Sequence, residues 1–378
     1  MRFIHLSDLH LGKKLREADL IEDQEYILKQ ILKVCDDEKA EAVLIAGDVF
    51  DRSIAPVEAL RIFDDFLSSL AERKIPVLII SGNHDSAERL SFGGGLFKAS
   101  GIYISNAYDG CVEKVVLNDE SGELNFYLLP FIKPSLVRPF FPDDKIESYT
   151  DAVRLVLEKE NVDFTKRNVI LSHQYITGAK RSESEESLVG GLENVDASVY
   201  DGFDYVALGH IHGPQKIDRE TLRYCGTPLK YSFSEAEHEK SVTVVDFAGK
   251  ENIKIKKVPL SPLREVRNLR GKFEELALKE NYEKFSRNDL IHITLTDETE
   301  ILDGWGKLKV IYPNLLLMEY DNERTKKSAE LGVSEKIALQ NPSELFADFF
   351  ENRNNVTMTE KQQLYIQNLI DEILEAKK

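Results

Sequence analysis

The 378-residue sequence predicts an α/β protein in which buried, mixed β-sheets are flanked by helices. Three observations predict this class. Short, fully apolar runs alternate with amphipathic helical patterns early in the chain, which is typical of buried sheets with helices outside. Residues 101–131 read as consecutive strands, so the sheets are expected to be mixed. The length exceeds that of one compact core and suits two domains with an appendage.

The first domain is expected to contain five buried strands, each a short apolar run. Between the first three strands lie two helical patterns with one apolar face each. The predicted strands are Phe3–Leu6, Ala42–Ala46, Val77–Ile80, Val169–Leu171 and Val206–Leu208. The predicted helix faces carry Ile27, Ile31 and Cys35 in the first pattern, and Leu60, Phe63, Leu67 and Leu70 in the second.

A domain boundary is predicted near residue 258, where Pro259 and Pro262 interrupt the pattern. A helical stretch and two strand-like runs then predict a small α/β domain. Two tail helices follow, of which the first has an N-cap and an N1 proline and the second opens with a capping box. We therefore expect domains at 1–258, 259–340 and 341–378. The residues behind these predictions are Phe273–Leu278, Leu290–Thr296, Leu315–Tyr320, Asn341, Pro342, Thr359–Gln362 and the stripe Ile366–Leu374.

Composition and charge exclude several classes. No apolar run reaches the length of a membrane span, and the strand-like start leaves no room for a signal peptide. The cysteines Cys35, Cys111 and Cys225 lie far apart, which argues against a disulfide framework or zinc finger and favours a cytoplasmic protein. The net charge of −17 alone would favour a small-molecule enzyme over a protein that coats DNA. Local positive charge or bound metal ions could still recruit DNA.

Each of the five predicted strands is followed by side chains that bind metals. The carboxyl ends of neighbouring strands meet in one crevice, so these side chains should converge. Seven ligands are too many for one ion, but a shared carboxylate would give each of two ions four protein ligands. Nitrogen and oxygen ligands without thiolate suit Mn²⁺ and permit Fe or Zn. The candidate ligands are Asp8, His10, Asp48, Asn83, His173, His210 and His212.

The alternative is that these residues are hydrogen-bonded core groups and turn residues. A single His-x-His would favour that interpretation, but five ligand sets that each follow an apolar strand do not. Three histidines outside the pattern receive the structural interpretation. His5 is expected to be a hydrogen-bonded core residue, and His238 and His292 are expected to be peripheral.

The ordered motifs Asp-x-His, Gly-Asp-x-x-Asp, Gly-Asn-His-Asp, a lone His and Gly-His-x-His resemble the calcineurin-like metallophosphoesterase superfamily. Within it, the stretches DVFDRSIAP, FDYVALGHIHGPQ and YCGTPLKYSFSE are similar to the SbcD family of bacterial nuclease subunits. The resemblance is strong over about the first 250 residues and weak in the tail. It implies a four-layer αββα fold with two central sheets, a small capping domain, a homodimer and an SbcC-type ATPase partner.

The resemblance also implies roles for single residues. One metal would be held by Asp8, His10, Asp48 and His212, and the other by Asp48, Asn83, His173 and His210. His84 would protonate or stabilise the leaving alkoxide, which suits an imidazole beside metal ions. Asp85 is expected to orient its loop. Asp51 stands where archaeal and eukaryotic relatives carry a histidine, so a paired-histidine mechanism is not implied here.

The leading hypothesis is a metal-dependent DNA nuclease, an exonuclease on double-stranded ends and an endonuclease on single-stranded or hairpin DNA. The alternatives are a small-nucleotide phosphodiesterase and a non-catalytic DNA-end-binding scaffold. No complete P-loop is present, so ATP dependence would come from the partner. DNA contacts are predicted at Lys13, Lys14, Arg264, Arg267, Arg270 and Lys272, with a solvated basic face as the alternative. Partner docking is predicted at Leu345, Phe346, Phe349, Phe350 and Ile366–Leu374, with packing on the capping domain as the alternative.

Overall fold

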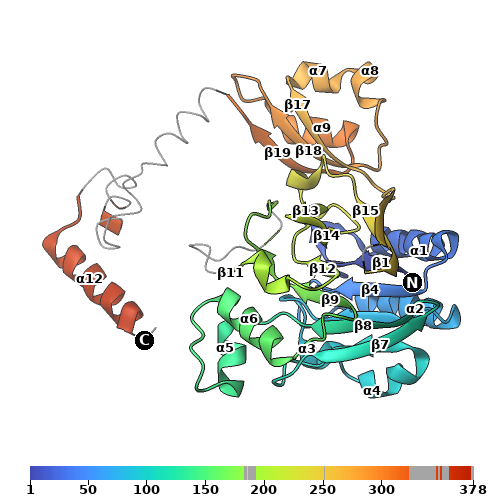
Figure 1. Cartoon of the computed structure of the whole chain (residues 1–378). Coiled ribbons are helices and arrows are strands. Elements are labelled where there is room, and N and C mark those ends of the chain that lie inside the picture. The colour runs from blue at the N-terminus through green and yellow to red at the C-terminus, as the bar shows by residue number, and fades with distance from the viewer. Residues whose placement is uncertain are drawn as a thin grey trace.

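The computed structural model describes residues 1–182, 185, 193–250, 252–322, 346, 347, 350 and 357–375 of the chain. Two six-stranded sheets dominate it (Figure 1). The first has the strand order β16-β15-β1-β4-β5-β6, and β1, β4, β5 and β6 run parallel. Its strands are β1 (Arg2–Leu6), β4 (Ala42–Ala46), β5 (Val77–Ile80), β6 (Ile102–Ile104), β15 (Ser241–Gly249) and β16 (Asn252–Pro259).

The second sheet has the order β13-β14-β12-β9-β8-β7. Its inner strands are parallel, while the edge strands β7 and β13 run antiparallel to their neighbours, so both sheets are mixed as predicted. Its strands are β7 (Glu113–Asp119), β8 (Gly122–Leu129), β9 (Arg167–His173), β12 (Tyr205–Gly209), β13 (Gln215–Ile217) and β14 (Arg219–Tyr224).

Three apolar cores define the predicted four layers. Residues that alternate along a strand face opposite sides of its sheet, so β4 sends Leu44 into the core between the sheets and Ile45 into the core under the helices. Helices α1 (Ile21–Glu38) and α2 (Val57–Glu72) cover the first sheet, and α6 (Tyr149–Lys159) packs on the second. A capping box starts α6, since Ser148 and Asp151 bond each other's backbone N–H groups.

One predicted helix face is partly wrong. The buried side of α2 includes Phe63, Leu67 and Leu70 as predicted, but Leu60 is half exposed. Ala59 and Ile62 occupy the buried side of the first turn instead, and Leu60 lines a surface hollow together with Phe50 and Ala55. His5 is a buried, hydrogen-bonded core residue as predicted, because its ring nitrogens lie 3.0 Å from the Tyr205 hydroxyl oxygen and 3.2 Å from the Leu208 carbonyl oxygen.

Short elements connect the layers. Two-stranded ribbons pair β2 with β3 and β10 with β11. The bounds are β2 (Lys14–Leu15), β3 (Ala18–Asp19), β10 (Tyr175–Ile176), β11 (Asn194–Val195), α3 (Ala87–Leu90), α4 (Gly94–Phe97), α5 (Pro134–Val137), and the 3₁₀ turns Lys98–Ser100, Arg138–Phe140, Ala197–Tyr200 and Phe233–Glu235.

A second unit with its own core lies beyond β16, drawn in orange in Figure 1. Three parallel strands pack against helices there. The predicted helical stretch and both predicted strands are present, and β17 and α9 complete the unit. Its elements are β17 (Val266–Gly271), α7 (Phe273–Ala277), α8 (Lys279–Tyr282), β18 (Leu290–Leu295), α9 (Gly304–Ile311) and β19 (Leu315–Tyr320).

The segment before β15 joins this unit to the first domain. Asn268 Nδ2 donates to the Phe233 carbonyl at 2.9 Å, and Lys230 Nζ lies 2.7 Å from Glu265 Oε1. The His292 ring lies 5.2 Å from the Phe233 ring. These contacts fix the second unit to residues 230–233 of the first domain.

The tail contains α12 (Glu360–Glu375) among the described residues. The predicted capping interaction is present in one direction, because the Thr359 backbone N–H donates to Gln362 Oε1 at 2.9 Å. The predicted first tail helix, with Asn341 and Pro342, begins outside the described residues. Within the described part of the chain, no helix is long and apolar enough to cross a membrane.

Candidate metal centre

The structure brings all seven predicted ligands to one edge of the stacked sheets. The first three motifs follow β1, β4 and β5 of the first sheet, and the last two follow β9 and β12 of the second. Because these strands point the same way, their carboxyl ends meet as predicted. The centre therefore lies across the junction of the two sheets.

One half of the centre holds a carboxylate and two imidazoles. Asp8, His10 and His212 are buried and offer ligand atoms within 4.8 Å of one another. The Nε2 atoms of His10 and His212 lie 3.2 Å apart. Two ring nitrogens that face each other with a carboxylate nearby can share a cation.

The other half is arranged around the Asn83 side chain. Its Oδ1 atom lies 3.1 Å from His173 Nε2 and 2.9 Å from His210 Nδ1. His173 Nδ1 lies 2.8 Å from the Ala46 carbonyl oxygen, which can only accept, so Nδ1 carries a proton and Nε2 faces the centre. These donors also form a compact set.

Asp48 lies between the two halves. Its Oδ2 atom is 3.3 Å from His173 Nε2 and 3.7 Å from His10 Nε2. Against the effect of burial, the Asp48 carboxylate raises the pKa of His173 to about 9, so positive charge is favoured at this place. A carboxylate that reaches both sets of donors has the position of a bridge between two cations.

Burial disfavours the charged forms of most of the other ligand groups. It raises the pKa of Asp8 to about 6, lowers the pKa of His210 to about 3, and lowers the pKa of His10 well below its ordinary value. His210 Nε2 is buried and has no hydrogen-bond partner among the described residues. Neutral imidazoles and closely spaced carboxylates fit divalent cations, which need lone pairs and negative charge.

The backbone is strained at this edge. Four candidate ligands have positive φ, at 53° for Asp8, 43° for His10, 48° for Asp48 and 102° for His210. L-residues rarely adopt this conformation, and clusters of it mark functional sites. The surrounding packing therefore holds these side chains toward the centre at a cost in backbone energy.

Glycines allow the two sheets to approach there. A Cβ at Gly82 would collide with the Asp48 carboxylate, and one at Gly47 would collide with the His173 ring. A Cβ at Gly209 would meet both the Ala46 carbonyl and His173. The glycines of the motifs are thus required by close contacts of the ligands.

His84 and Asp85 follow the ligand Asn83. The His84 backbone N–H donates to Asp48 Oδ1 at 2.9 Å, and the His84 ring meets the His10 ring edge-on at 4.8 Å. Asp85 accepts hydrogen bonds from the backbone N–H groups of Val49, Phe50 and Gly82, which orients both ligand loops. Burial raises the pKa of Asp85 to about 6.

Asp51 is engaged with a residue predicted to contact DNA. Its Oδ1 atom lies 2.7 Å from Lys13 Nζ and 3.7 Å from His10 Nδ1. The pair is largely buried, with exposed side-chain fractions of 17% for Lys13 and 13% for Asp51. Lys13 therefore neutralises the Asp51 carboxylate, which lies behind the candidate ligand His10.

Sequence reasoning missed a group of residues behind the centre. Tyr231 donates to the Leu9 carbonyl and packs edge-on against His10, and Gln24 Nε2 donates to the His10 carbonyl at 2.7 Å. Glu235 lies 3.4 Å from His212 Nδ1. Tyr231 and Glu235 lie in the stretch YCGTPLKYSFSE, but only the folded chain shows which ligands they touch.

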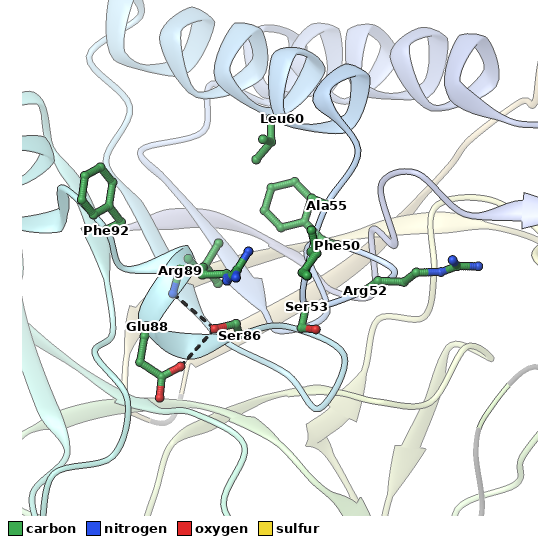
Figure 2. A pocket seen from close by; sticks show the side chains of 11 residues that line it. Phe50, Arg52, Ser53, Ala55, Leu60, Ser86, Glu88, Arg89 and Phe92 are labelled. Atoms are coloured by element: carbon green, nitrogen blue, oxygen red, sulfur yellow. Dashed lines mark hydrogen bonds between the residues drawn. The ribbon is translucent and has the colours of Figure 1, made fainter.

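A hollow of about 380 Å³ is lined by Phe50, which follows the candidate ligand Asp48 by two residues (Figure 2). Its walls come from the segment after Asp51, the segment after Asp85, and α2. Phe50, Ala55 and Leu60 form one apolar side, and Phe92 lies on the other (Figure 2). Arg52 and Arg89 also line it.

The predicted DNA-contacting residues of the second unit are largely engaged in ion pairs. Arg264 pairs with Asp23, a carboxylate that is almost fully buried, and Arg267 pairs with Asp289 at 2.6 Å. Arg270 lies 2.5 Å from Asp321 and keeps 56% of its side chain exposed. Lys272 is exposed, and Lys14 lies 3.6 Å from Asp19 on the first unit.

Comparisons with known proteins decide the family. Residues 1–214 match the family described as calcineurin-like phosphoesterase. A relative named as the D subunit of nuclease SbcCD, from Staphylococcus epidermidis, is 34% identical over 99% of both chains. This chain belongs to the calcineurin-like phosphoesterases, in the SbcD family. It is thus a hydrolase of the metallophosphoesterase type, and its buried Asp and His side chains form clusters that could hold metal ions.

Further comparisons include a second family model, a second relative and a solved structure. Residues 261–354 match the family described as the type 5 capsule protein repressor C-terminal domain. A second D subunit of nuclease SbcCD, from Staphylococcus saprophyticus, is 32% identical over 99% of both chains. The crystal structure of a dimetal phosphatase from Danio rerio is 12% identical, covers 70% of this chain and 98% of its own, and has a TM-score of 0.45.

Proposed function

We propose that this chain is the nuclease subunit of an ATP-driven DNA-end-processing complex in the cytoplasm. It would act as an exonuclease on double-stranded ends and as an endonuclease on single-stranded or hairpin DNA. The observation that carries the proposal is the convergence of two donor sets around Asp48. Its support from relatives is that proteins named as D subunits of nuclease SbcCD align with nearly the whole chain.

The residues would hold two divalent cations, with Mn²⁺ as the preferred ion. We assign Asp8, His10, Asp48 and His212 to one cation, and Asp48, Asn83, His173 and His210 to the other. When bound, two cations would neutralise phosphate charge and lower the pKa of a bridging water. The nitrogen-rich, thiolate-free donor set supports Mn²⁺ and admits Fe or Zn.

His84 would serve the leaving group. Its Nδ1 atom lies 3.0 Å from the Asp51 carbonyl oxygen, so Nδ1 donates and Nε2 stays available at the centre. An imidazole placed there can pass a proton to a departing alkoxide oxygen. Because His84 also forms a cluster with His10 and Asp48 whose ligand atoms lie within 4.8 Å of one another, metal content must be measured alongside activity.

DNA would run from the centre toward the second unit. Among the six basic residues predicted to bind it, Lys14, Arg270 and Lys272 are exposed, while Lys13, Arg264 and Arg267 are committed to internal ion pairs. We therefore propose the exposed three as phosphate contacts and the others as supports. Residues 259–340 would form the capping domain beside the nuclease domain 1–258.

An SbcC-type ATPase would dock on the tail, residues 341–378. Leu364 and Tyr365 of α12 are exposed, which leaves apolar area for a partner. Of the predicted docking residues, Leu345 and Phe349 lie outside the described part of the chain. The structure describes the other two, of which Phe346 is exposed and Phe350 is half-buried.

We also propose a homodimer, with the hollow lined by Phe50 as part of its interface. Ile54, Val57 and Phe92 are 67%, 76% and 84% exposed, and Leu60 lies one helical turn after Val57. A second copy of the chain would cover these side chains. Light scattering after size-exclusion chromatography should give a dimer for the wild type and a monomer for Val57→Glu with Leu60→Glu. A monomeric wild type, or a dimeric variant, would exclude this surface.

Two alternative functions would rely on the same residues. A small-nucleotide phosphodiesterase would use the same ligands, and a DNA-end-binding scaffold would bind without cleavage. A nuclease assay with Mn²⁺ on short duplexes and hairpins, beside bis-p-nitrophenyl phosphate, separates the three. We expect cleavage of both DNA substrates. Turnover of the small diester alone would support the phosphodiesterase, and binding without any turnover would support the scaffold.

A further inference from the structure

A buried ion pair lies directly behind the metal centre. Glu235 is fully buried and Lys240 is 5% exposed, and the Lys240 Nζ and Glu235 Oε2 atoms lie 2.5 Å apart. Both residues belong to the segment that leads from the Gly-His-x-His motif to β15. Burying two charges is costly, and it is offset only where further hydrogen bonds satisfy both groups. The additional hydrogen bonds of this pair therefore show which groups it holds in place.

Both charges hold His212. Glu235 Oε1 lies 3.4 Å from His212 Nδ1, and Lys240 Nζ donates to the His212 carbonyl oxygen at 3.1 Å. Thr227 ties the two together, because its hydroxyl oxygen accepts from Lys240 Nζ at 2.6 Å and lies 3.3 Å from Glu235 Oε2. The pair thus contacts the imidazole and the backbone of one proposed ligand at once.

The contact determines which ring nitrogen faces the centre. His212 Nε2 points to His10 Nε2 at 3.2 Å, while Nδ1 points to Glu235. A carboxylate that accepts the Nδ1 proton leaves the lone pair on Nε2. A carboxylate in this place fixes both the tautomer and the ring orientation of a metal-binding histidine.

We propose that Glu235, held in place by Lys240, is a positioning residue that orients His212 toward the cation shared with Asp8 and His10. The proposal rests on the assignment of His212 as a ligand. In the second donor set, the His173 ring is held by a different group, the Ala46 carbonyl oxygen, which lies 2.8 Å from Nδ1. Loss of Glu235 should therefore weaken one cation site and spare the other.

Titration of the metal-free protein with Mn²⁺, followed by electron paramagnetic resonance and calorimetry, tests this without an activity measurement. Wild-type protein should show two sites. Glu235→Gln should lower the affinity of one by about 10- to 100-fold, the usual effect of losing such a partner. Glu235→Asp, which keeps the charge but shortens the reach, should give a smaller loss at the same site.

The chain offers a matched control at the far end of β9. Asp119 and Arg167 form a comparably buried pair, at 2.7 Å and with 5% and 8% of their side chains exposed. Asp119→Asn should reduce thermal stability and leave both Mn²⁺ affinities unchanged. Equal effects of Asp119→Asn and Glu235→Gln on Mn²⁺ binding would show a general loss of stability and overturn the proposal.

Two further variants keep the outcomes distinct. Glu235→Met with Lys240→Met replaces the pair by apolar side chains of similar size, which folded proteins often tolerate. It should fold and show the same loss at one site. His212→Ala should lose that site entirely. If His212→Ala loses the site but every folded Glu235 variant binds as wild type does, positioning by Glu235 is wrong. If His212→Ala binds both ions normally, the ligand assignment itself is wrong.

Discussion

The His84 Nδ1 atom lies 3.0 Å from the backbone carbonyl oxygen of Asp51. The Nδ1 atom is therefore held by a backbone acceptor. A backbone acceptor survives any substitution at Asp51. The orientation of His84 should accordingly depend on the loop and not on the identity of residue 51.

Replacement of His84 tests its role at the leaving group. His84→Ala should lower kcat by about 10²- to 10⁴-fold, the usual contribution of a positioned general acid. DNA affinity and the content of both metal ions should stay unchanged, because no proposed ligand is removed. Single-turnover cleavage and elemental analysis measure these quantities. Loss of one ion from the variant would make His84 a ligand and contradict the division of roles.

Gly82→Ala tests the close approach around Asp48. The added methyl group would collide with the Asp48 carboxylate and backbone, so the proposed bridge must shift. We expect reduced Mn²⁺ affinity and loss of cleavage in a folded protein. Gly95→Ala is the control, because its Cβ would meet nothing within 4 Å. Wild-type metal binding by Gly82→Ala would refute the packing argument.

Exposed basic residues of the second unit can be tested without damage to buried carboxylates. Neutralising Arg264 or Arg267 would leave the buried carboxylate of Asp23 or Asp289 without its ion-pair partner. The variant Arg270→Gln with Lys272→Gln avoids this loss. Its slope of log K against log salt should be shallower by about 0.9 for each phosphate that the variant no longer neutralises.

The control for this experiment is Lys279→Gln with Lys284→Gln, two changes in the same unit that should leave the slope unchanged. Fluorescence anisotropy on a short duplex between low and moderate salt gives both slopes. A wild-type slope for the Arg270 and Lys272 variant would remove these residues from the DNA interface.

Truncation after Gln340 tests the tail. The shortened chain should keep Mn²⁺-dependent cleavage of single-stranded DNA, because every proposed ligand precedes residue 213. It should lose co-purification with the SbcC-type ATPase and ATP-stimulated degradation of duplex DNA. Unchanged affinity for the ATPase would end the docking proposal, and failure of the truncated chain to fold would place the tail helices in the core.

Much of the fold and the ligand set could be predicted because the signals are local. The bounds of β4 and β5 coincide with continuous apolar runs, and each ligand motif directly follows such a run. Strands β13 to β17 were not predicted, and charged residues interrupt β13, β14, β16 and β17. In β16, Ile253 and Ile255 alternate with lysines, and only the pairing with β15 reveals the strand.

Contacts between distant segments escaped prediction. Glu235 follows His212 by more than twenty residues, and the sequence does not indicate that a 3₁₀ turn brings it back to the ring. The ion pairs of Lys13, Arg264 and Arg267 depend in the same way on the folded chain. Spacing alone predicts Leu60 on the buried face of α2, whereas Ala59 and Ile62 occupy the buried side of the first turn and Leu60 stays half exposed.

The metal content of an Asp48 variant tests the central claim most directly. Asn is among the residues that tolerate positive φ, so Asp48→Asn preserves the backbone at 48° while removing the charge that would bridge two cations. Wild-type protein should bind two Mn²⁺ ions per chain and cleave DNA. Asp48→Asn, and likewise Asp48→Ala, should bind at most one ion tightly and show no cleavage. Two tightly bound ions with unchanged turnover in either variant would contradict the account.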